Sequence, residues 1–123
     1  GSIVRAIGQS IAGLFSNNST FAKNILSAGK SVGEKFWEMP LEMEYRSQLD
    51  DPVADLRNMD KSEAGSITAS LVLQEFVPPG AIWSHIDIAG TAFAEKNWKY
   101  YSEGATGFGV KTLVALAKSM ANR

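Results

Sequence analysis

The sequence predicts an α/β fold in which helices alternate with short apolar strands. Two observations support this class. Apolar residues recur at helical spacing in several segments, and short apolar runs bounded by turn residues lie between them, at 11–15 and 81–89. This alternation is typical of a layered domain. Because an average sheet has about five or six strands, we expect one small domain or part of a larger one.

The first segments predict a short helix followed by a strand. Apolar residues over 3–7 fit one or two helical turns, which Gly8 ends. The run 11–15 is typical of a buried strand, and the polar stretch 16–19 predicts a turn after it.

A long helix is expected next, from a cap at Ser19 or Thr20 to the break at Pro40. Gly29 and Gly33 interrupt it, and we expect close packing against a neighbour at both. Its apolar positions are Phe21, Ile25, Leu26, Val32, Phe36 and Trp37.

The middle of the chain predicts two further helices. An amphipathic helix is expected over 41–49, and an edge strand or extended loop over 53–59. The pattern over 66–76 favours a second helix with Ser66 as its N-cap, although its β-branched residues also fit a strand. The prolines and glycine at 78–80 end that helix.

A strand over 81–89 and a final helix complete the prediction. We expect Thr106 to cap this helix, after the glycine-rich segment 104–109. The expected apolar stripe of this helix comprises Val110, Leu113, Val114 and Ala117.

The totals describe an ordinary globular chain of 123 residues, 45% of them hydrophobic, with enough apolar material for a modest core. A net charge of −1 gives no electrostatic signature of binding to nucleic acid or to an anionic membrane. The lack of cysteine excludes disulfides, thiolate metal sites and a cysteine nucleophile. No apolar run approaches the ~20 residues that span a bilayer. We therefore expect a soluble cytoplasmic protein.

His85 and Asp87 are the first candidates for chemistry. They lie two residues apart on the expected strand, so both side chains point to one face beside Trp83. Such a pair can ligate a metal or act as a base with its orienting carboxylate. The alternative, which we favour, is a buried histidine with an aspartate that caps a nearby turn.

Two other patterns have simpler explanations. Asp50, Asp51 and Asp55 lack the central glycine of a calcium loop, so turn chemistry and solvated charge are expected. The segment 104–109 resembles a phosphate loop at a helix N-terminus but lacks the lysine of a P-loop, and close helix packing is the favoured explanation.

Six segments of the sequence carry a family resemblance. They are AGLFSN at 12–17, GEKFWEMPL at 33–41, ADLRN at 54–58, AGSITA at 64–69, HIDIAG at 85–90 and GATGFG at 104–109. In this order they resemble the end of the catalytic domain of leucyl aminopeptidases, also called cytosol aminopeptidases. The resemblance covers essentially the whole chain. It implies that residues 1–123 are the C-terminal segment of a layered α/β domain, with helices packed on a mixed central sheet.

The resemblance also implies a parent enzyme that removes N-terminal residues from peptides. The family's enzymes hold two divalent metal ions, zinc or manganese, through a lysine and several carboxylates, and they assemble as cytoplasmic homo-hexamers. Two metals make a nucleophile from bound water at neutral pH. The family's metal-binding and catalytic residues lie upstream of the stretch that Gly1 matches. The resemblance therefore implies no catalytic residue and no metal ligand here, and an inactive isolated segment.

The resemblance implies that this segment forms part of the pocket that determines substrate specificity. Met59, Ala89 and Ala92 match positions that line the hydrophobic pocket for the N-terminal side chain of the substrate. The alternative for these three residues is ordinary core packing.

Two other hypotheses stay open at this stage. The chain is an inactive structural or interaction module that retains part of the peptidase fold, or it is a small metal-binding protein that uses His85 and Asp87. The sequence upstream of Gly1 would distinguish the structural or interaction module from the peptidase segment. Metal analysis would test the metal-binding protein.

Overall fold

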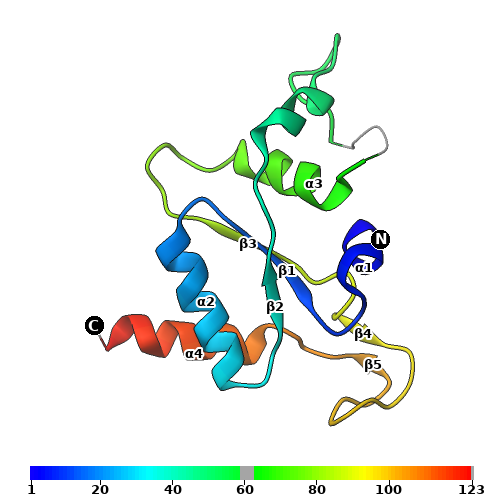
Figure 1. Ribbon diagram of the computed structural model, residues 1–123, viewed down its shortest axis with the longest axis vertical. Helices are drawn as coiled ribbons and strands as arrows, with labels where there is room; N and C mark the ends of the chain where they lie inside the picture. The colour runs from blue at the N-terminus through cyan, green and yellow to red at the C-terminus, as the bar shows by residue number, and fades with distance from the viewer. Residues whose placement is uncertain (59–62, 123) are drawn as a thin grey trace.

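The computed structural model describes residues 1–58 and 63–122, which form four helices, a 3₁₀ helix and five short strands (Figure 1). In chain order the elements are α1 (Ser2–Ile7), β1 (Ala12–Ser16), α2 (Ser19–Ser31), β2 (Phe36–Glu38), η1 (Met43–Leu49), α3 (Gly65–Gln74), β3 (Ser84–Asp87), β4 (Phe93–Ala94), β5 (Gly104–Ala105) and α4 (Val110–Ala121). The predicted α/β class is confirmed.

The central sheet is mixed and has the strand order β2-β1-β3. β1 runs parallel to β2 and antiparallel to β3. Phe15 pairs with His85 and Gly13 with Asp87, so the two candidate side chains leave β3 on the face that also carries Phe15. β4 and β5 form a separate two-stranded ladder.

Helices pack on both faces of this sheet. On one face Leu14 packs with Ile25 of α2 and Leu116 of α4 in the main core cluster. On the other face Ile3 of α1 lies directly over Gly13, where a Cβ would stand 2.7 Å from Ile3 Cδ1. Figure 1 shows α2 and α4 packed together, away from α1 and α3. The result is a three-layer arrangement around β1.

The predicted long helix is wrong in its second half. α2 ends at Ser31, Gly33 takes a positive φ of 77°, and the chain returns as β2 beside β1. Tertiary pairing with β1 therefore overrides the helical spacing of the later apolar residues. Close packing is confirmed at Gly29, where a Cβ would lie 2.6 Å from the ring of Phe36. At Gly33 the requirement is conformational instead.

Helix starts also differ from the prediction. α2 is capped by Asn18, whose side chain accepts from the Phe21 amide at 2.8 Å. α3 begins at Gly65, and Ser66 lies inside it, with its hydroxyl donating to Asp87 rather than capping the helix.

The helix expected over 41–49 is the 3₁₀ helix η1, which starts only at Met43, and no strand forms over the described part of 53–59. The strand expected over 81–89 is limited to β3, because the side chain of Asn17 bonds to the Ala81 carbonyl and the Trp83 amide in place of a ladder.

The last helix differs most. α4 is preceded by Gly109 and not by Thr106, whose hydroxyl donates to the Thr91 carbonyl at 2.7 Å. The apolar stripe expected on this helix does not face the core: Val110, Leu113 and Val114 are exposed, whereas Thr112 and Leu116 are buried. The helices within residues 1–58 and 63–122 include none with the length and hydropathy of a membrane span.

Candidate functional site

A tight turn follows β3 and holds two of the predicted pocket residues. Asp87 accepts a hydrogen bond from the Ala89 amide at 3.1 Å, and the Ile88 carbonyl accepts from the amides of Thr91 and Ala92 at 3.0 and 2.9 Å. A Cβ on Gly90 would stand 2.6 Å from the Gly8 carbonyl oxygen, so only glycine fits there. The turn is thereby fixed against the end of α1.

Ala89 and Ala92 are brought together by this turn. Ala89 is exposed and Ala92 is half-buried, so Ala89 is not a core contact of the described chain. The Ala92 carbonyl accepts from the Thr106 amide at 3.0 Å, which connects the turn to the glycine-rich segment. Met59, the third predicted pocket residue, lies outside the described residues.

His85 lies between two aromatic rings. Its imidazole stacks on Phe15 and on Trp83, with ring centroids 5.9 and 6.4 Å apart. Burial lowers the pKa of His85, and the nearby charge of Asp87 opposes that shift. The imidazole is therefore neutral at pH 7 and is placed as a packing group.

Asp87 is already engaged by its own chain. Its Oδ2 accepts from the Ser66 hydroxyl at 2.7 Å and its Oδ1 from the Ala89 amide. This is the turn-capping role that the sequence favoured. In the described ranges no group of three His, Cys, Asp or Glu side chains is placed to hold a metal ion.

The acidic segment after η1 has the expected turn chemistry. Asp51 accepts from the amides of Val53 and Ala54 and from Arg57, and these backbone hydrogen bonds are the main cause that lowers its pKa. Asp50 pairs with Arg46, which also bonds to Glu75.

The segment 104–109 does not form a phosphate loop. The α4 N-terminus is occupied by Glu34, whose carboxylate accepts from the amides of Gly109 and Thr112 at 2.8 and 3.0 Å. Close packing is also wrong for the glycines here: Gly104, Gly107 and Gly109 have positive φ, and a Cβ on any of them would meet nothing within 4 Å. They serve the turn conformation. Glu34 was not identified from the sequence as a capping residue. The one indication of its importance was its position in the segment 33–41, which carries part of the family resemblance.

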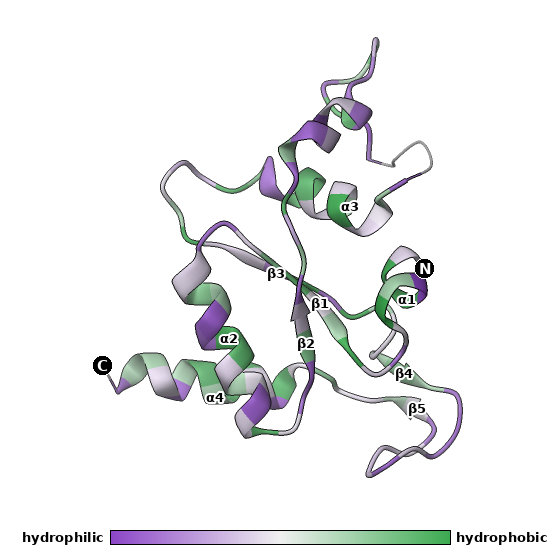
Figure 2. Ribbon diagram, in the orientation of Figure 1, coloured by the Kyte–Doolittle hydropathy of each residue, from purple (hydrophilic) through white to green (hydrophobic). Residues whose placement is uncertain are grey.

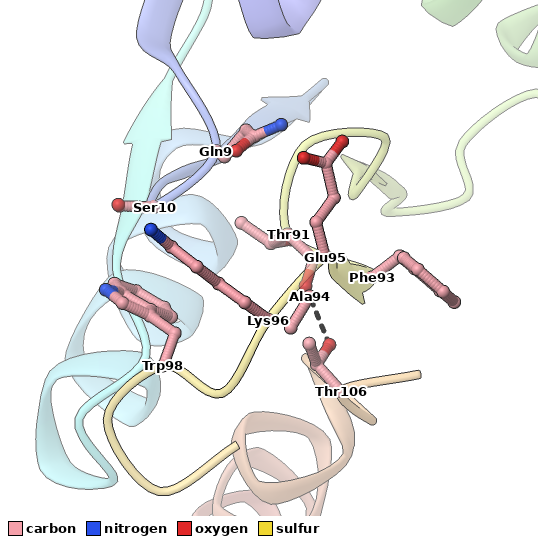
Figure 3. A pocket seen from close by; sticks show the side chains of 9 residues that line it. All are labelled: Gln9, Ser10, Thr91, Phe93, Ala94, Glu95, Lys96, Trp98 and Thr106. Atoms are coloured by element: carbon pink, nitrogen blue, oxygen red, sulfur yellow. Dashed lines mark hydrogen bonds between the residues drawn. The ribbon is translucent and has the colours of Figure 1, made fainter. Parts of the chain in front are cut away.

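An open cavity of about 370 Å³ lies beside the turn. Figure 3 shows Gln9 and Ser10 of the α1–β1 connection at its upper left with Trp98 below them, and Phe93, Glu95 and Thr106 across from them. Lys96 and Trp98 contribute a cation and an aromatic ring to its wall. Nearby, burial and the neighbouring Tyr100 raise the pKa of Tyr101 to about 12, so this phenol is protonated at neutral pH and is not a general base.

Known proteins match this chain along nearly all of its length. Residues 1–114 match the catalytic domain of the cytosol aminopeptidase family. A probable cytosol aminopeptidase of Picosynechococcus is 50% identical over 93% of this chain and 23% of its own length. The corresponding protein of Chlamydia trachomatis is 44% identical over 93% of this chain and 23% of its own length. This chain thus spans about a quarter of the curated relatives that it matches.

Solved structures agree with this match. The bottromycin maturation enzyme BotP, in a complex with Mn, matches 98% of this chain and 27% of its own with a TM-score of 0.95 and 33% identity. A tomato leucine aminopeptidase mutant matches 94% of this chain and 22% of its own with a TM-score of 0.84 and 38% identity. The predicted resemblance is confirmed, since the matched residues 1–114 include all six segments, and the chain belongs to the cytosol aminopeptidase family.

Proposed function

We propose that this chain is the C-terminal part of the catalytic domain of a two-metal aminopeptidase, which hydrolyses N-terminal residues from peptides. The observation that carries the proposal is the family match over residues 1–114. The fold supports it, since solved relatives with 32–38% identity superpose on nearly the whole chain.

The isolated chain is catalytically silent in this proposal. Asp87, the carboxylate that the sequence suggested as a metal ligand, already accepts hydrogen bonds from Ser66 and Ala89. The single histidine of the chain is stacked between two aromatic rings. The metals, zinc or manganese, are held by other residues of the parent enzyme. Manganese is the metal in the BotP complex.

The part of the reaction that belongs to this chain is substrate selection. Ala89 and Ala92 present small apolar side chains on a turn that is fixed from three directions: by Asp87, by Gly8 and by Thr106. Together with Met59 they line the pocket for the substrate's N-terminal side chain. A rigid turn suits this role, because a pocket discriminates well only when its walls cannot yield.

Hydrolysis of leucine p-nitroanilide with added Mn²⁺ tests the proposal. We expect no turnover by the isolated chain and turnover by a chimera in which it replaces the matching residues of the Picosynechococcus relative. Activity of the isolated chain that survives repurification would contradict its proposed silence. An inactive, folded and metal-loaded chimera would instead favour a non-catalytic structural module.

The parent's assembly and location follow from the same proposal. We expect a cytoplasmic homo-hexamer that acts on peptides and binds neither nucleic acid nor membranes. Light scattering on the purified chimera measures the assembly directly.

A further inference from the structure

Thr106 holds the end of the turn that carries Ala92. Its hydroxyl donates to the Thr91 carbonyl at 2.7 Å, a bond that Figure 3 draws as a dashed line, and its amide donates to the Ala92 carbonyl at 3.0 Å. Asp87 holds the other end of the turn through the Ala89 amide. The two ends are therefore fixed by different parts of the chain, and the Ala92 end depends on the glycine-rich segment.

Thr106 is itself anchored in the core. Its hydroxyl also accepts from the Phe108 amide at 3.1 Å, as a hydroxyl can donate and accept at once. The ring of Phe108 lies against that of Phe36 in β2, with centroids 5.3 Å apart. The next amide, of Gly109, donates to the carboxylate of Glu34, which is 2% exposed. Thr106 therefore connects the turn to the buried N-terminus of α4.

The turn is blocked on one side and open on the other. A Cβ on Gly90 would stand 2.6 Å from the Gly8 carbonyl oxygen, so the end of α1 blocks movement in that direction. On the other side lies the open cavity of about 370 Å³, which Thr91 lines and Ala92 does not. The Ala92 side chain therefore points away from the cavity, and a shift of the turn into the cavity would draw Ala92 back from the proposed substrate pocket.

The far wall of the cavity is exposed. Residues 95–100, which include the wall residues Lys96 and Trp98, are exposed to solvent. Figure 2 shows hydrophilic residues along much of this connection between β4 and β5. Exposed side chains move aside easily, because few packing contacts hold them. The bond from the Thr106 hydroxyl to Thr91 is therefore the main restraint on this side of the turn.

We propose that Thr106 is a positioning residue of the substrate pocket. Its hydroxyl, through Thr91, holds Ala92 forward and so limits the size of the N-terminal side chain that the parent enzyme accepts. This inference rests on the proposed function. The amide bond to Ala92 continues the β4–β5 ladder and does not depend on the side chain, so the hydroxyl is the specific contribution of threonine at this position.

Three variants separate this role from ordinary support of the fold. Thr106→Val keeps the shape of the side chain and removes the hydroxyl, which leaves the Thr91 carbonyl and the Phe108 amide without this partner. Thr106→Ser restores the hydroxyl. Thr112→Val is the matched control, since the Thr112 hydroxyl is buried at the same helix end and bonds to Glu34 at 2.7 Å instead of to the turn.

Amide hydrogen exchange, followed by NMR on this chain, measures the turn directly. The amides of Thr91 and Ala92 both donate to the Ile88 carbonyl, so their exchange rates report opening of the turn. Relative to the amides of β1, which correct for global stability, these rates should rise at least ~10-fold in Thr106→Val. They should stay near the wild-type values in Thr106→Ser and Thr112→Val. Unchanged relative rates in Thr106→Val would overturn the inference.

Substrate preference is measured in the Picosynechococcus chimera. The ratio of kcat/KM for phenylalanine p-nitroanilide to that for alanine p-nitroanilide should rise at least ~5-fold in Thr106→Val, because the retracted turn leaves room for the larger side chain. The fit of one methylene in a hydrophobic pocket changes such a ratio by about 10–200-fold. Thr106→Ser and Thr112→Val should keep the wild-type ratio, in which the folded fraction of each preparation cancels. A looser turn with an unchanged ratio would overturn the inference, because Thr106 would then support only the fold.

Failure of the inference and failure of the proposed function give different results. An active chimera whose ratio does not respond to Thr106→Val contradicts this inference alone. A folded, metal-loaded wild-type chimera without activity contradicts the proposed function and, with it, the role of Thr106 in specificity. The exchange rates in this chain would still decide whether Thr106 holds the turn.

Discussion

The carboxylate of Glu34 accepts two hydrogen bonds from Thr112, one from the amide at 3.0 Å and one from the hydroxyl at 2.7 Å. Its other oxygen accepts from the Gly109 amide at 2.8 Å. Glu34 is 2% exposed, and it supplies the cap that the first turn of α4 lacks. A buried anion at a helix N-terminus is stabilised by unpaired amides and by the helix dipole. This contact joins the turn before β2 to α4, far along the sequence.

The first prediction concerns this cap. Glu34→Gln should lower the free energy of unfolding by about 1–3 kcal/mol, because the amide NH₂ cannot accept from Gly109 and leaves a buried donor unpaired. Urea unfolding followed by circular dichroism measures the change. Glu38→Gln, at an exposed site on β2, is the control and should change stability by less than about 0.5 kcal/mol. Equal effects of the two substitutions would show that Glu34 is not the cap.

The second prediction concerns Gly29, where α2 crosses β2. Gly29→Ala should destabilise the chain by about 1–3 kcal/mol through overpacking, since the new Cβ would stand 2.6 Å from the Phe36 ring and 2.9 Å from the Glu34 carbonyl oxygen. Alanine's better helix propensity, about 1 kcal/mol, offsets only part of this. Lys30→Ala on the exposed side of the same helix should be nearly neutral. A stabilising Gly29→Ala would mean that propensity outweighs the contact.

His85 predicts a pH dependence of stability. Because burial lowers its pKa in the folded state, the unfolded chain binds the proton more readily below about pH 6.5. The histidine therefore costs no stability at about pH 8, and stability falls as the pH drops through about 6.5 toward the lower folded value. Unfolding free energies of wild type and His85→Gln between about pH 8 and pH 5.5 measure the effect. The variant's profile should be flatter, and parallel profiles would contradict the prediction.

Local sequence rules predicted the elements whose signals are local. The helix over 3–7 with Gly8 at its end, the strand over 11–15 and the capping role of Asp87 were all confirmed. Each depends on residues within a few positions of one another, so spacing and turn chemistry were sufficient.

The errors arose where distant residues decide the structure. Phe36 has helical spacing but pairs with β1, and Thr106 precedes a helix that Glu34 caps from 75 residues away. The apolar stripe expected on the last helix, which is Val110, Leu113, Val114 and Ala117, lies outside the core. Thr112 and Leu116 face the core instead, and periodicity alone cannot reveal which side of such a helix meets the core.

The proposed pocket predicts a change in substrate preference. In the Picosynechococcus chimera, Ala92→Phe should lower kcat/KM for leucine p-nitroanilide relative to alanine p-nitroanilide. The phenyl ring introduced at position 92 would fill the space that the larger substrate side chain needs. A change of about 10–200-fold in the ratio is expected for a hydrophobic pocket. Ala54→Phe, at an exposed position of the loop after η1, should leave the ratio unchanged. If Ala92→Phe leaves the ratio of the two kcat/KM values unchanged, Ala92 does not line the pocket.

The last prediction concerns the hydrogen bond between Ser66 and Asp87. It joins α3 to the end of β3 at 2.7 Å, and the other oxygen of Asp87 holds the Ala89 amide. Ser66→Ala should cost about 1.5–3 kcal/mol, as expected for a hydrogen bond to a charged group. Asp87→Asn should cost a similar amount, since the amide keeps an acceptor for only one of the two donors.

A double-mutant cycle separates this bond from ordinary packing. If Ser66 acts through Asp87, the double variant should be less destabilised than the sum of the single variants, with a coupling of about 0.5–3 kcal/mol. Additive effects would mean that the two side chains stabilise the fold independently. Coupled effects would establish that α3 fixes the turn that carries Ala89, so that a residue outside the proposed pocket sets its shape.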